Sequence, residues 1–242
     1  MNYQLESLEQ MHNYYGWVFD ELSPFIGRRV LEIGAGTGNF SRMLLKSDPT
    51  IDHIWLVEPN AQLATVLAEQ FAGEQNIKVL QLSAEDLDHS LLVALKLDTI
   101  IMINVLEHIE NDIDLLGRCA AVLQPEGKLL TFSPAFPLLY SHYDRLVGHY
   151  RRYTKKEIHK KFAVAGFKMH YLKYFNMVGF FAWLLLMRFL KLETFGDNKL
   201  KLYEKMIGWM RMAEQRFNPP FGQNLIAVGV VEASSAAMEQ HS

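Results

Sequence analysis

Cysteine is almost absent from this sequence of 242 residues, which contains only Cys119. A single cysteine cannot form a disulfide within the chain, and this composition suits a reducing compartment. It also excludes an iron–sulfur cluster held by three or four cysteines of the same chain. Because Cys119 lies in the helical pattern GRCAAVL, we interpret it as a packed core residue.

Long apolar runs are also lacking. The longest extends from Met177 to Met187 and is closed by Arg188, which is too short for a helix across a bilayer. The first ten residues, MNYQLESLEQ, have neither the basic nor the apolar region of a signal peptide. We therefore expect a cytoplasmic protein, with at most a peripheral contact at the inner face of the membrane.

Basic side chains are scarce in the first part of the chain and acidic ones in the second, although the net charge of the whole chain is only −3. Residues 1–140 contain 8 basic and 19 acidic side chains, whereas residues 141–242 contain 16 basic and 8 acidic ones. This asymmetry indicates an anionic partner for the second half.

Short runs rich in Val, Ile and Leu alternate with helical patterns through the first half of the chain. The predicted strands cover residues 28–33, 53–58, 77–82, 97–104 and 128–133, with a last strand at 225–232. Apolar residues at helical spacing separate them, as in residues 61–72 and 113–123. The alternation predicts an α/β fold, a doubly wound parallel sheet with helices on both faces.

The stretch VLEIGAGTGNF follows the first predicted strand and contains Gly34, Gly36 and Gly38. In a dinucleotide fingerprint the third glycine comes one residue later. Ligands bind at the carboxyl ends of strands in such sheets, and glycines there let the backbone approach them closely. Glu32 suits an ammonium group, and Glu58 in VEPN is placed to accept both hydroxyls of a ribose. A ribose and an ammonium without phosphate describe S-adenosylmethionine (SAM).

These features resemble the class I SAM-dependent methyltransferases. The motifs that carry the resemblance are, in chain order, VLEIGAGTGNF, VEPN, LSAEDL, INVLEHIEND and LQPEGKLL. The resemblance implies a Rossmann-like, mostly parallel seven-stranded sheet with a helical insertion before the last strand. It also implies SAM as methyl donor and S-adenosylhomocysteine as product. We expect one domain over residues 1–242, divided into a SAM-binding core (25–134), an acceptor loop (135–153), a helical insertion or lid (173–222) and the last strand (223–232).

The resemblance also assigns cofactor contacts by position. Gly34 and Gly36 should line the methionyl part, and Glu58 should hold the ribose. The full predicted set is Glu32, Gly34, Ala35, Gly36, Gly38, Glu58, Pro59, Ser83, Ala84, Glu85, Asn104 and Val105. The family often has Asp where Ser83 stands, so the adenine amino group is left to Glu85, Asp86 or the backbone.

The polar stretch PAFPLLYSHYDRLVGHYRRYT, residues 134–154, follows the fifth strand, where this fold carries acceptor-binding segments. It resembles a subgroup of bacterial class I methyltransferases with a GHYRRY run. Histidine is the side chain best suited to accept a proton near neutral pH. We predict His149 as the catalytic base, with Tyr153 and His108 as further catalytic residues. The alternative is that His149 and Arg152 tie the loop to the sheet.

A metal site is not expected. In ubiquinone-pathway O-methyltransferases, a segment at a similar position has the sequence E-x-x-E-H and binds a divalent ion. Here Asn104 replaces the first acid of that run, which weakens a site for a hard cation. We interpret Glu107 and His108 as residues that begin and orient the helix after the fourth strand.

The function that these residues favour is methyl transfer from SAM to a small-molecule or lipid-like, anionic acceptor, at oxygen or nitrogen. The alternatives are an RNA methyltransferase, which the basic second half suggests, and a SAM-binding partner subunit without catalysis. Nucleic acid is disfavoured because residues 177–190 are apolar and no RNA-binding module is recognised. Arg188 and Lys191 close this apolar segment, so we expect a lid that touches lipid or a membrane surface. The alternative is a homodimer interface through residues 177–190.

Overall fold

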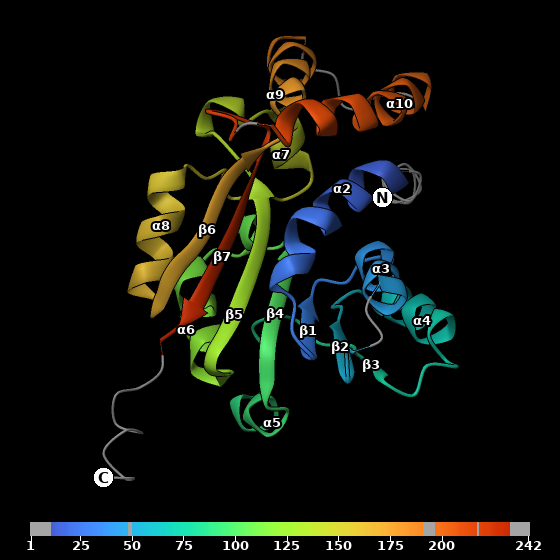
Figure 1. Cartoon of the computed structure of the whole chain (residues 1–242), viewed down its shortest axis with the longest axis vertical. Coiled ribbons are helices and arrows are strands. Elements are labelled where there is room, and N and C mark those ends of the chain that lie inside the picture. Colours follow the sequence, from blue (N-terminus) through green and yellow to red (C-terminus); the bar gives the residue numbers. More distant parts are fainter. Residues whose placement is uncertain (1–10, 48–49, 191–196, 217, 233–242) are drawn as a thin grey trace.

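The computed structural model describes residues 11–47, 50–190, 197–216 and 218–232. One seven-stranded sheet has the strand order β3-β2-β1-β4-β5-β7-β6 (Figure 1). Its strands are β1 (Arg29–Ile33), β2 (His53–Val57), β3 (Ile77–Leu80), β4 (Leu97–Ile103), β5 (Leu123–Pro134), β6 (Phe167–Phe175) and β7 (Asn224–Val231). Strands β1 to β5 are parallel, and β7 runs antiparallel to both β5 and β6. The predicted mostly parallel, seven-stranded α/β sheet is therefore confirmed.

The helices of the described chain cover both faces of this sheet (Figure 1). They are α2 (His12–Leu22), α3 (Asn39–Ser47), α4 (Ala61–Gln70), α5 (His89–Ala94), α6 (Asp112–Val122), α7 (His142–Leu146), α8 (Lys155–Val164), α9 (Met177–Trp183) and α10 (Asp197–Glu214). Short 3-10 turns cover Ser23–Phe25, Leu106–His108 and Pro137–Leu139, and a π-helical turn, Leu184–Phe189, continues α9.

Two hydrophobic clusters, one on each face, hold the helices to the sheet. Leu31 and Ile33 of β1 pack in the cluster that contains residues of α5, α6 and α8. Val30 of the same strand packs in the other cluster, with residues of α2, α3, α4 and α10. Neighbouring strand residues point to opposite faces, so a sheet covered on both sides needs a continuous apolar run. The run VLEI satisfies this requirement except at Glu32, which is buried.

The strand order reverses at β1, which pairs with β2 on one side and β4 on the other. Helix α3, after β1, packs in one cluster, and α6, after β4, packs in the other. The two connections therefore leave the sheet in opposite directions and open a crevice at the carboxyl ends of these strands, where ligands bind in such folds.

Strand β6 is absent from the sequence prediction. It lies at the edge of the sheet, and exposed polar residues such as Lys168 and His170 interrupt its apolar pattern. Its end corrects the predicted insertion, 173–222, because Lys173 to Phe175 pair with β7. The insertion before the last strand therefore begins at Asn176.

The insertion itself is helical, as the sequence predicts. It consists of α9 with its π-helical turn and of α10, and Figure 1 places both at one end of the sheet, beside α7 and the start of α2. The Glu214 carboxylate of α10 accepts hydrogen bonds from the backbone of Asn176 and Met177, and thereby ties α10 to the start of α9. Glu204 accepts from the backbone amide groups of Asn13 and Tyr14. Lys191 lies outside the described residues.

None of the helices formed by the described residues has the length and apolar character required to cross a membrane.

Candidate active site

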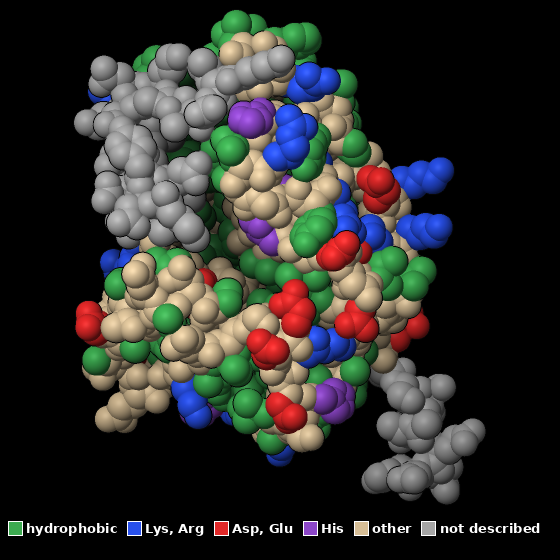
Figure 2. All heavy atoms as spheres, turned by 180° about the vertical axis from the view of Figure 1, so that it is seen from behind, with side chains coloured by type: hydrophobic (Ala, Val, Ile, Leu, Met, Phe, Trp, Pro, Cys, Tyr) green, Lys and Arg blue, Asp and Glu red, His purple; other side chains and the backbone are tan. Residues whose placement is uncertain are grey.

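A cavity of about 870 Å³ lies at the carboxyl ends of β1, β2 and β4. Its walls come from the loops after these strands, from residues 83–85, from the acceptor loop and from the helical insertion. Figure 2 shows the molecule from behind, with a hollow in the middle of this face and hydrophobic side chains on its floor. Of the predicted cofactor residues, all but Gly38 line the cavity: Glu32, Gly34, Ala35, Gly36, Glu58, Pro59, Ser83, Ala84, Glu85, Asn104 and Val105.

The glycine loop turns through three residues with positive φ, which glycine adopts at little cost. A Cβ on Gly34 would lie 2.4 Å from the Val105 side chain, and one on Gly38 would lie 2.8 Å from Leu67. A Cβ on Gly36 would meet nothing within 4 Å, because this residue faces the cavity. Gly36 is therefore the glycine of this loop on which a Cβ would point into open cavity space. Gly38 packs against α4, which corrects its assignment as a cofactor-lining residue.

Glu58 joins the loops after β1 and β2. Its carboxylate accepts a hydrogen bond from the Gly36 amide at 2.8 Å and another from the Asn60 amide at 2.9 Å. The side chain is buried but lines the cavity. A carboxylate in this position can also accept hydrogen bonds from a diol in the cavity.

Glu32 forms part of the cavity floor. It accepts a hydrogen bond from the Ser41 hydroxyl at 2.6 Å. Burial, with a smaller contribution from the nearby Glu58, raises the pKa of Glu32 to about 7. An ammonium group beside this carboxyl would favour its charged form and lower the pKa again.

The segment after β3 supplies the next wall. The Ser83 hydroxyl donates to the Asp86 carboxylate at 2.7 Å, and Asp86 is not among the lining residues. Glu85 does line the cavity. The sequence analysis offered Glu85 and Asp86 as partners of the adenine amino group, and of these two only Glu85 lines the cavity.

The loop after β4 begins with Asn104, whose φ of 53° is in the left-handed region. Asparagine tolerates this conformation better than most residues. The Asn104 amide donates to the Phe132 carbonyl at 2.8 Å, so the turn is anchored to β5. Asn104 and Val105 of this anchored turn both line the cavity.

Asp144 holds the acceptor loop in place from a fully buried position. Its carboxylate accepts from the Ser141 amide and hydroxyl, from Arg152 Nε at 2.8 Å and from His149 Nδ1 at 2.8 Å. Burial alone would raise the pKa of Asp144, but the His149 hydrogen bond and the Arg152 charge lower it below its ordinary value. A charged Asp144 keeps the proton of His149 on Nδ1 and leaves Nε2 as an acceptor.

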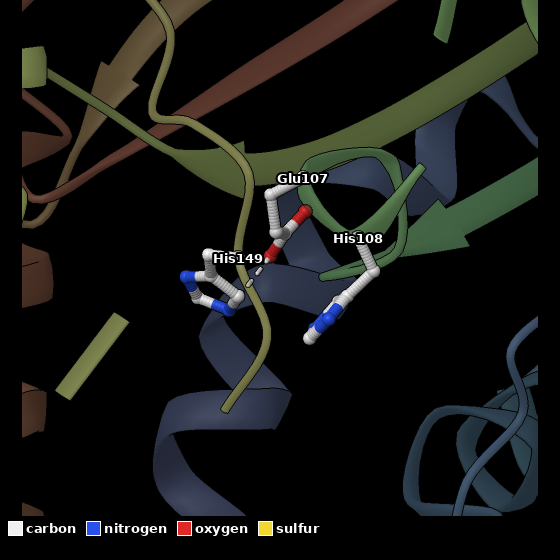
Figure 3. Close-up of side chains that lie close together, drawn as sticks. All are labelled: Glu107, His108 and His149. Carbon is white, nitrogen blue, oxygen red and sulfur yellow. Dashed lines mark ion pairs between the residues drawn. The ribbon is translucent and has the colours of Figure 1, made fainter. Parts of the chain in front are cut away.

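Glu107 lies beside His149 and has an unusual environment. It is fully buried, and neither carboxylate oxygen has a hydrogen-bond partner. Burial raises the pKa of Glu107 to about 8. His149 Nε2 is 3.9 Å from its Oε1, and the His108 ring meets the His149 ring edge-on at a centroid distance of 4.6 Å (Figure 3). The structure thus brings together two of the three predicted catalytic residues and adds a carboxylate that the sequence assigned only to the helix start.

Tyr153, the third predicted catalytic residue, does not reach the cavity. Its side chain is buried, and its hydroxyl contacts the Leu106 carbonyl at 3.0 Å and Asp112 Oδ2 at 2.9 Å. Burial and the Asp112 carboxylate raise the pKa of Tyr153 far above its ordinary value. These contacts make Tyr153 a structural residue beneath the acceptor loop and correct the prediction.

A further part of the cavity wall comes from residues that the sequence analysis did not assign to the site. Tyr14 and Tyr15 of α2, Trp183 and Leu186 of the insertion, and Tyr203 of α10 all line the cavity. The Trp183 indole donates to the Leu139 carbonyl at 3.0 Å, and the Arg152 guanidinium lies 4.5 Å from its ring centroid. The apolar character of residues 177–187 was the available signal, but it did not indicate which side faces the cavity.

Comparison with known proteins places these observations in a family. Residues 31–129 match the family model of a methyltransferase domain. A ubiquinone biosynthesis O-methyltransferase of Paracidovorax citrulli is 30% identical over 112 residues, which cover 46% of this chain and 45% of the relative. The chain therefore spans less than half the length of this curated relative.

Solved structures share the fold at low sequence identity. A SAM-dependent methyltransferase from Mesorhizobium loti superposes with a TM-score of 0.58 at 12% identity, over 88% of this chain and 97% of the other. The 4+2 cyclase SpnF has a TM-score of 0.57 at 13% identity, over 92% and 82% of the two chains. Because a cyclase has this fold as well, the fold alone does not determine the reaction.

Over residues 31–129 the chain is similar to the methyltransferase-domain family, and the described chain has the fold of solved SAM-dependent methyltransferases. SAM is the cofactor of this family.

Substitution of Gly36 should weaken SAM binding. Gly36→Ala places a Cβ in the cavity. It also forces a positive φ on alanine, a strained backbone conformation that costs about 1–3 kcal/mol. We expect isothermal titration to show a clear loss of SAM affinity. Gly117→Ala is the matched control, because a Cβ there also meets nothing within 4 Å but lies on α6. Equal SAM affinity in both variants would contradict this role of the loop.

Substitution of Glu58 should weaken SAM binding without unfolding the protein. Glu58→Ala removes a carboxylate that can accept the ribose hydroxyls, and hydrogen bonds to a charged group contribute roughly 1.5–3 kcal/mol. Titration should show an affinity about 10- to 150-fold lower. Glu69→Ala, at an exposed position on α4, is the control and should bind SAM normally. An unchanged affinity in folded Glu58→Ala would show that Glu58 does not hold the ribose.

Proposed function

We propose that this protein transfers a methyl group from SAM to a small-molecule or lipid-like, anionic acceptor, at oxygen or nitrogen. The observation that carries the proposal is that one cavity joins the predicted cofactor residues to His149 and to the apolar wall of the helical insertion. Donor and acceptor could therefore meet in a single cavity, and alignment at short distance is the main requirement of methyl transfer.

The walls of the cavity support two occupants. Sites for a single small ligand measure roughly 300–1,000 Å³, and this cavity, at about 870 Å³, lies at the upper end of that range. Contacts predicted for SAM account for the walls formed by the loops after β1, β2, β3 and β4. The acceptor would take the remaining space, between the acceptor loop and the insertion.

The remaining walls indicate the chemistry of the acceptor. Leu146 and Val147 lie on the acceptor-loop side, and Ala182, Trp183 and Leu186 lie on the insertion side. These side chains favour an apolar group, and His149 places one polar atom among them. The relatives named as ubiquinone biosynthesis O-methyltransferases support an oxygen as the methylated atom.

Methyl transfer would proceed as an in-line displacement. A lone pair of the acceptor forms a bond to the methyl carbon while the carbon–sulfur bond breaks. The electron pair of that bond stays on sulfur, which gives S-adenosylhomocysteine. The acceptor proton would pass to Nε2 of the neutral His149 ring, whose Nδ1–H donates to Asp144, and the Asp144 carboxylate would stabilise the imidazolium that forms.

Loss of His149 should remove turnover but spare cofactor binding. We expect His149→Ala to lower the rate of methyl transfer by roughly 10²–10⁴-fold, the usual contribution of a positioned base, with nearly unchanged SAM affinity. The control is His159→Ala, at an exposed position on α8. The acceptor is first identified by incubating wild-type protein with methyl-labelled SAM and fractionated cell extract. Label in RNA, or SAM binding without transfer to any fraction, would contradict the proposed function.

The outer side of the insertion supports contact with a membrane surface. Large apolar side chains are exposed there, namely Phe181, Leu185, Phe189, Leu190, Leu202, Met206, Trp209 and Met212. The exposed cations Arg188 and Lys205 lie on the same elements, and the exposed Arg216 follows the end of α10. An apolar surface with cations at its rim suits an anionic bilayer, from which a lipid-like acceptor could enter the cavity.

Vesicle flotation tests this contact. Wild-type protein should bind anionic vesicles in a salt-sensitive manner, and Trp209→Asp should abolish binding because the side chain is 64% exposed on α10. Val164→Asp is the control, since Val164 is 63% exposed on α8, away from the insertion. Trp183 is unsuitable for this test, because its side chain is buried in the cavity wall. Absence of binding, together with a dimer that Trp209→Asp dissociates, would favour the homodimer interface instead.

A further inference from the structure

A network of neutral polar side chains lies where β5 ends and β7 begins. Asn224 is the first residue of β7 and pairs with Pro134, the last residue of β5. Gln223 precedes it, and Tyr203 reaches the network from α10. Tyr203, Gln223 and Asn224 all line the cavity, and none of them is among the predicted cofactor contacts. This part of the wall therefore belongs to the space proposed for the acceptor.

Asn176 fixes the direction of two hydrogen bonds in this network. It is fully buried, and its Oδ1 accepts from the Gly179 amide at 2.8 Å. Its Nδ2 donates both to the Tyr203 hydroxyl oxygen and to Gln223 Oε1. Because both partners act as acceptors toward Asn176, the Tyr203 O–H and the Gln223 Nε2 amide are left to other partners.

Tyr14 has the same effect on Asn224. Its hydroxyl donates to Asn224 Oδ1 at 3.0 Å, which leaves the Nδ2 amide of Asn224 as a further donor. Burial raises the pKa of the Tyr14 and Tyr203 hydroxyls above their ordinary range, so both keep their protons at neutral pH. Within the described part of the chain, the Tyr203 O–H, Gln223 Nε2 and Asn224 Nδ2 have no acceptor. Asn224 is only 6% exposed, and a donor so placed is costly unless something in the cavity accepts from it.

We propose that Tyr203, Gln223 and Asn224 form a subsite for an uncharged oxygen of the acceptor molecule that accepts hydrogen bonds, such as a carbonyl or ether oxygen. Three donors meet there, and an oxygen that only accepts satisfies them without a competing proton. The subsite deepens the proposed function and rests on it. It would hold a second oxygen of the molecule whose methylated atom lies at His149.

The charges around the network favour a neutral oxygen over a carboxylate or a phosphate. Glu204 and Glu214 of α10 each accept hydrogen bonds from backbone amides of residues in this network. Lys173, the cation that acts on Glu214, is paired with Glu21 at 2.6 Å. An anionic group in the subsite would therefore meet neutral donors with two carboxylates behind them. A negatively charged group of the acceptor would lie outside this subsite.

Titration with small aromatic probes tests the subsite without turnover. Acetophenone has a carbonyl oxygen beside an apolar ring, benzoate has a carboxylate in its place, and ethylbenzene lacks the oxygen. Wild-type protein in the presence of S-adenosylhomocysteine should bind acetophenone about tenfold more tightly than either of the other two, the effect of one to two hydrogen bonds. Ligand-detected NMR measures these affinities.

Replacement of a donor by an acceptor should change this preference. Gln223→Glu keeps the size of the side chain and the oxygen that accepts from Asn176, but it replaces Nε2 by a second oxygen. Affinity for acetophenone should fall about tenfold, whereas affinity for benzyl alcohol, whose hydroxyl can donate, should be kept or rise. Tyr203→Phe removes one donor without adding charge and should also weaken acetophenone binding. Gln124→Glu, at an exposed position near the start of β5, is the control and should bind every probe as the wild type does. Thermal unfolding establishes that each variant is folded.

Three results would overturn the proposal. The first is that wild-type protein binds acetophenone no more tightly than ethylbenzene, or does not bind it. The second is acetophenone binding that neither Gln223→Glu nor Tyr203→Phe weakens, and the third is tighter binding of benzoate, which would indicate a subsite for anions. Methyl transfer into extract fractions separates this proposal from the proposed function. Methylation of a small molecule or lipid without the probe preference would remove only the subsite, whereas the probe preference without any methyl transfer would remove the proposed function and leave a binding site for such oxygens.

Discussion

The site depends on one topological constraint, the position of β1 between β2 and β4. Helix α3 follows β1 to one face of the sheet, and α6 follows β4 to the other. No helix can close the space between these diverging connections, so the crevice at the strand ends remains open. The glycine loop, Glu58 and the turn at Asn104 all lie around this crevice. The acceptor loop and the insertion then convert it into a cavity.

Buried charge distinguishes the acceptor side from the cofactor side. Asp144 and Arg152 are both fully buried, but each is compensated by the other and by further hydrogen bonds. A buried pair of this kind contributes little net stability, but it fixes geometry, because removal of either partner leaves a charge without compensation. Glu107 lies close by without a hydrogen-bond partner, and burial raises its pKa to about 8, which favours the neutral carboxyl. The fold thus fixes the orientation of His149 firmly and keeps a carboxyl group without hydrogen bonds beside it, an arrangement that suits a ligand-binding centre better than a packed core.

The sequence predicts the core of the fold and the cofactor side well, because both depend on local signals. Apolar runs locate six strands, and the glycine spacing with Glu58 locates the crevice. Strand β6 escapes prediction because an edge strand is polar on its exposed side. Gly38 and Tyr153 are misplaced because residue type does not reveal direction: one packs on α4, and the other is held by Asp112. The convergence of Glu107 and His149, about forty residues apart, depends on the path of the acceptor loop, which no local pattern encodes.

Direct side-chain contacts join the insertion to the acceptor loop. Arg152 contacts Asp144 with its guanidinium edge and the Trp183 ring with its face. The Trp183 indole also donates to Leu139, near the start of the acceptor loop. Asp144 in turn accepts from His149 Nδ1, so one continuous set of contacts joins Trp183 of the insertion to the imidazole. The apolar wall and the proposed base are therefore positioned by the same buried residues, and neither can be replaced without regard to the other.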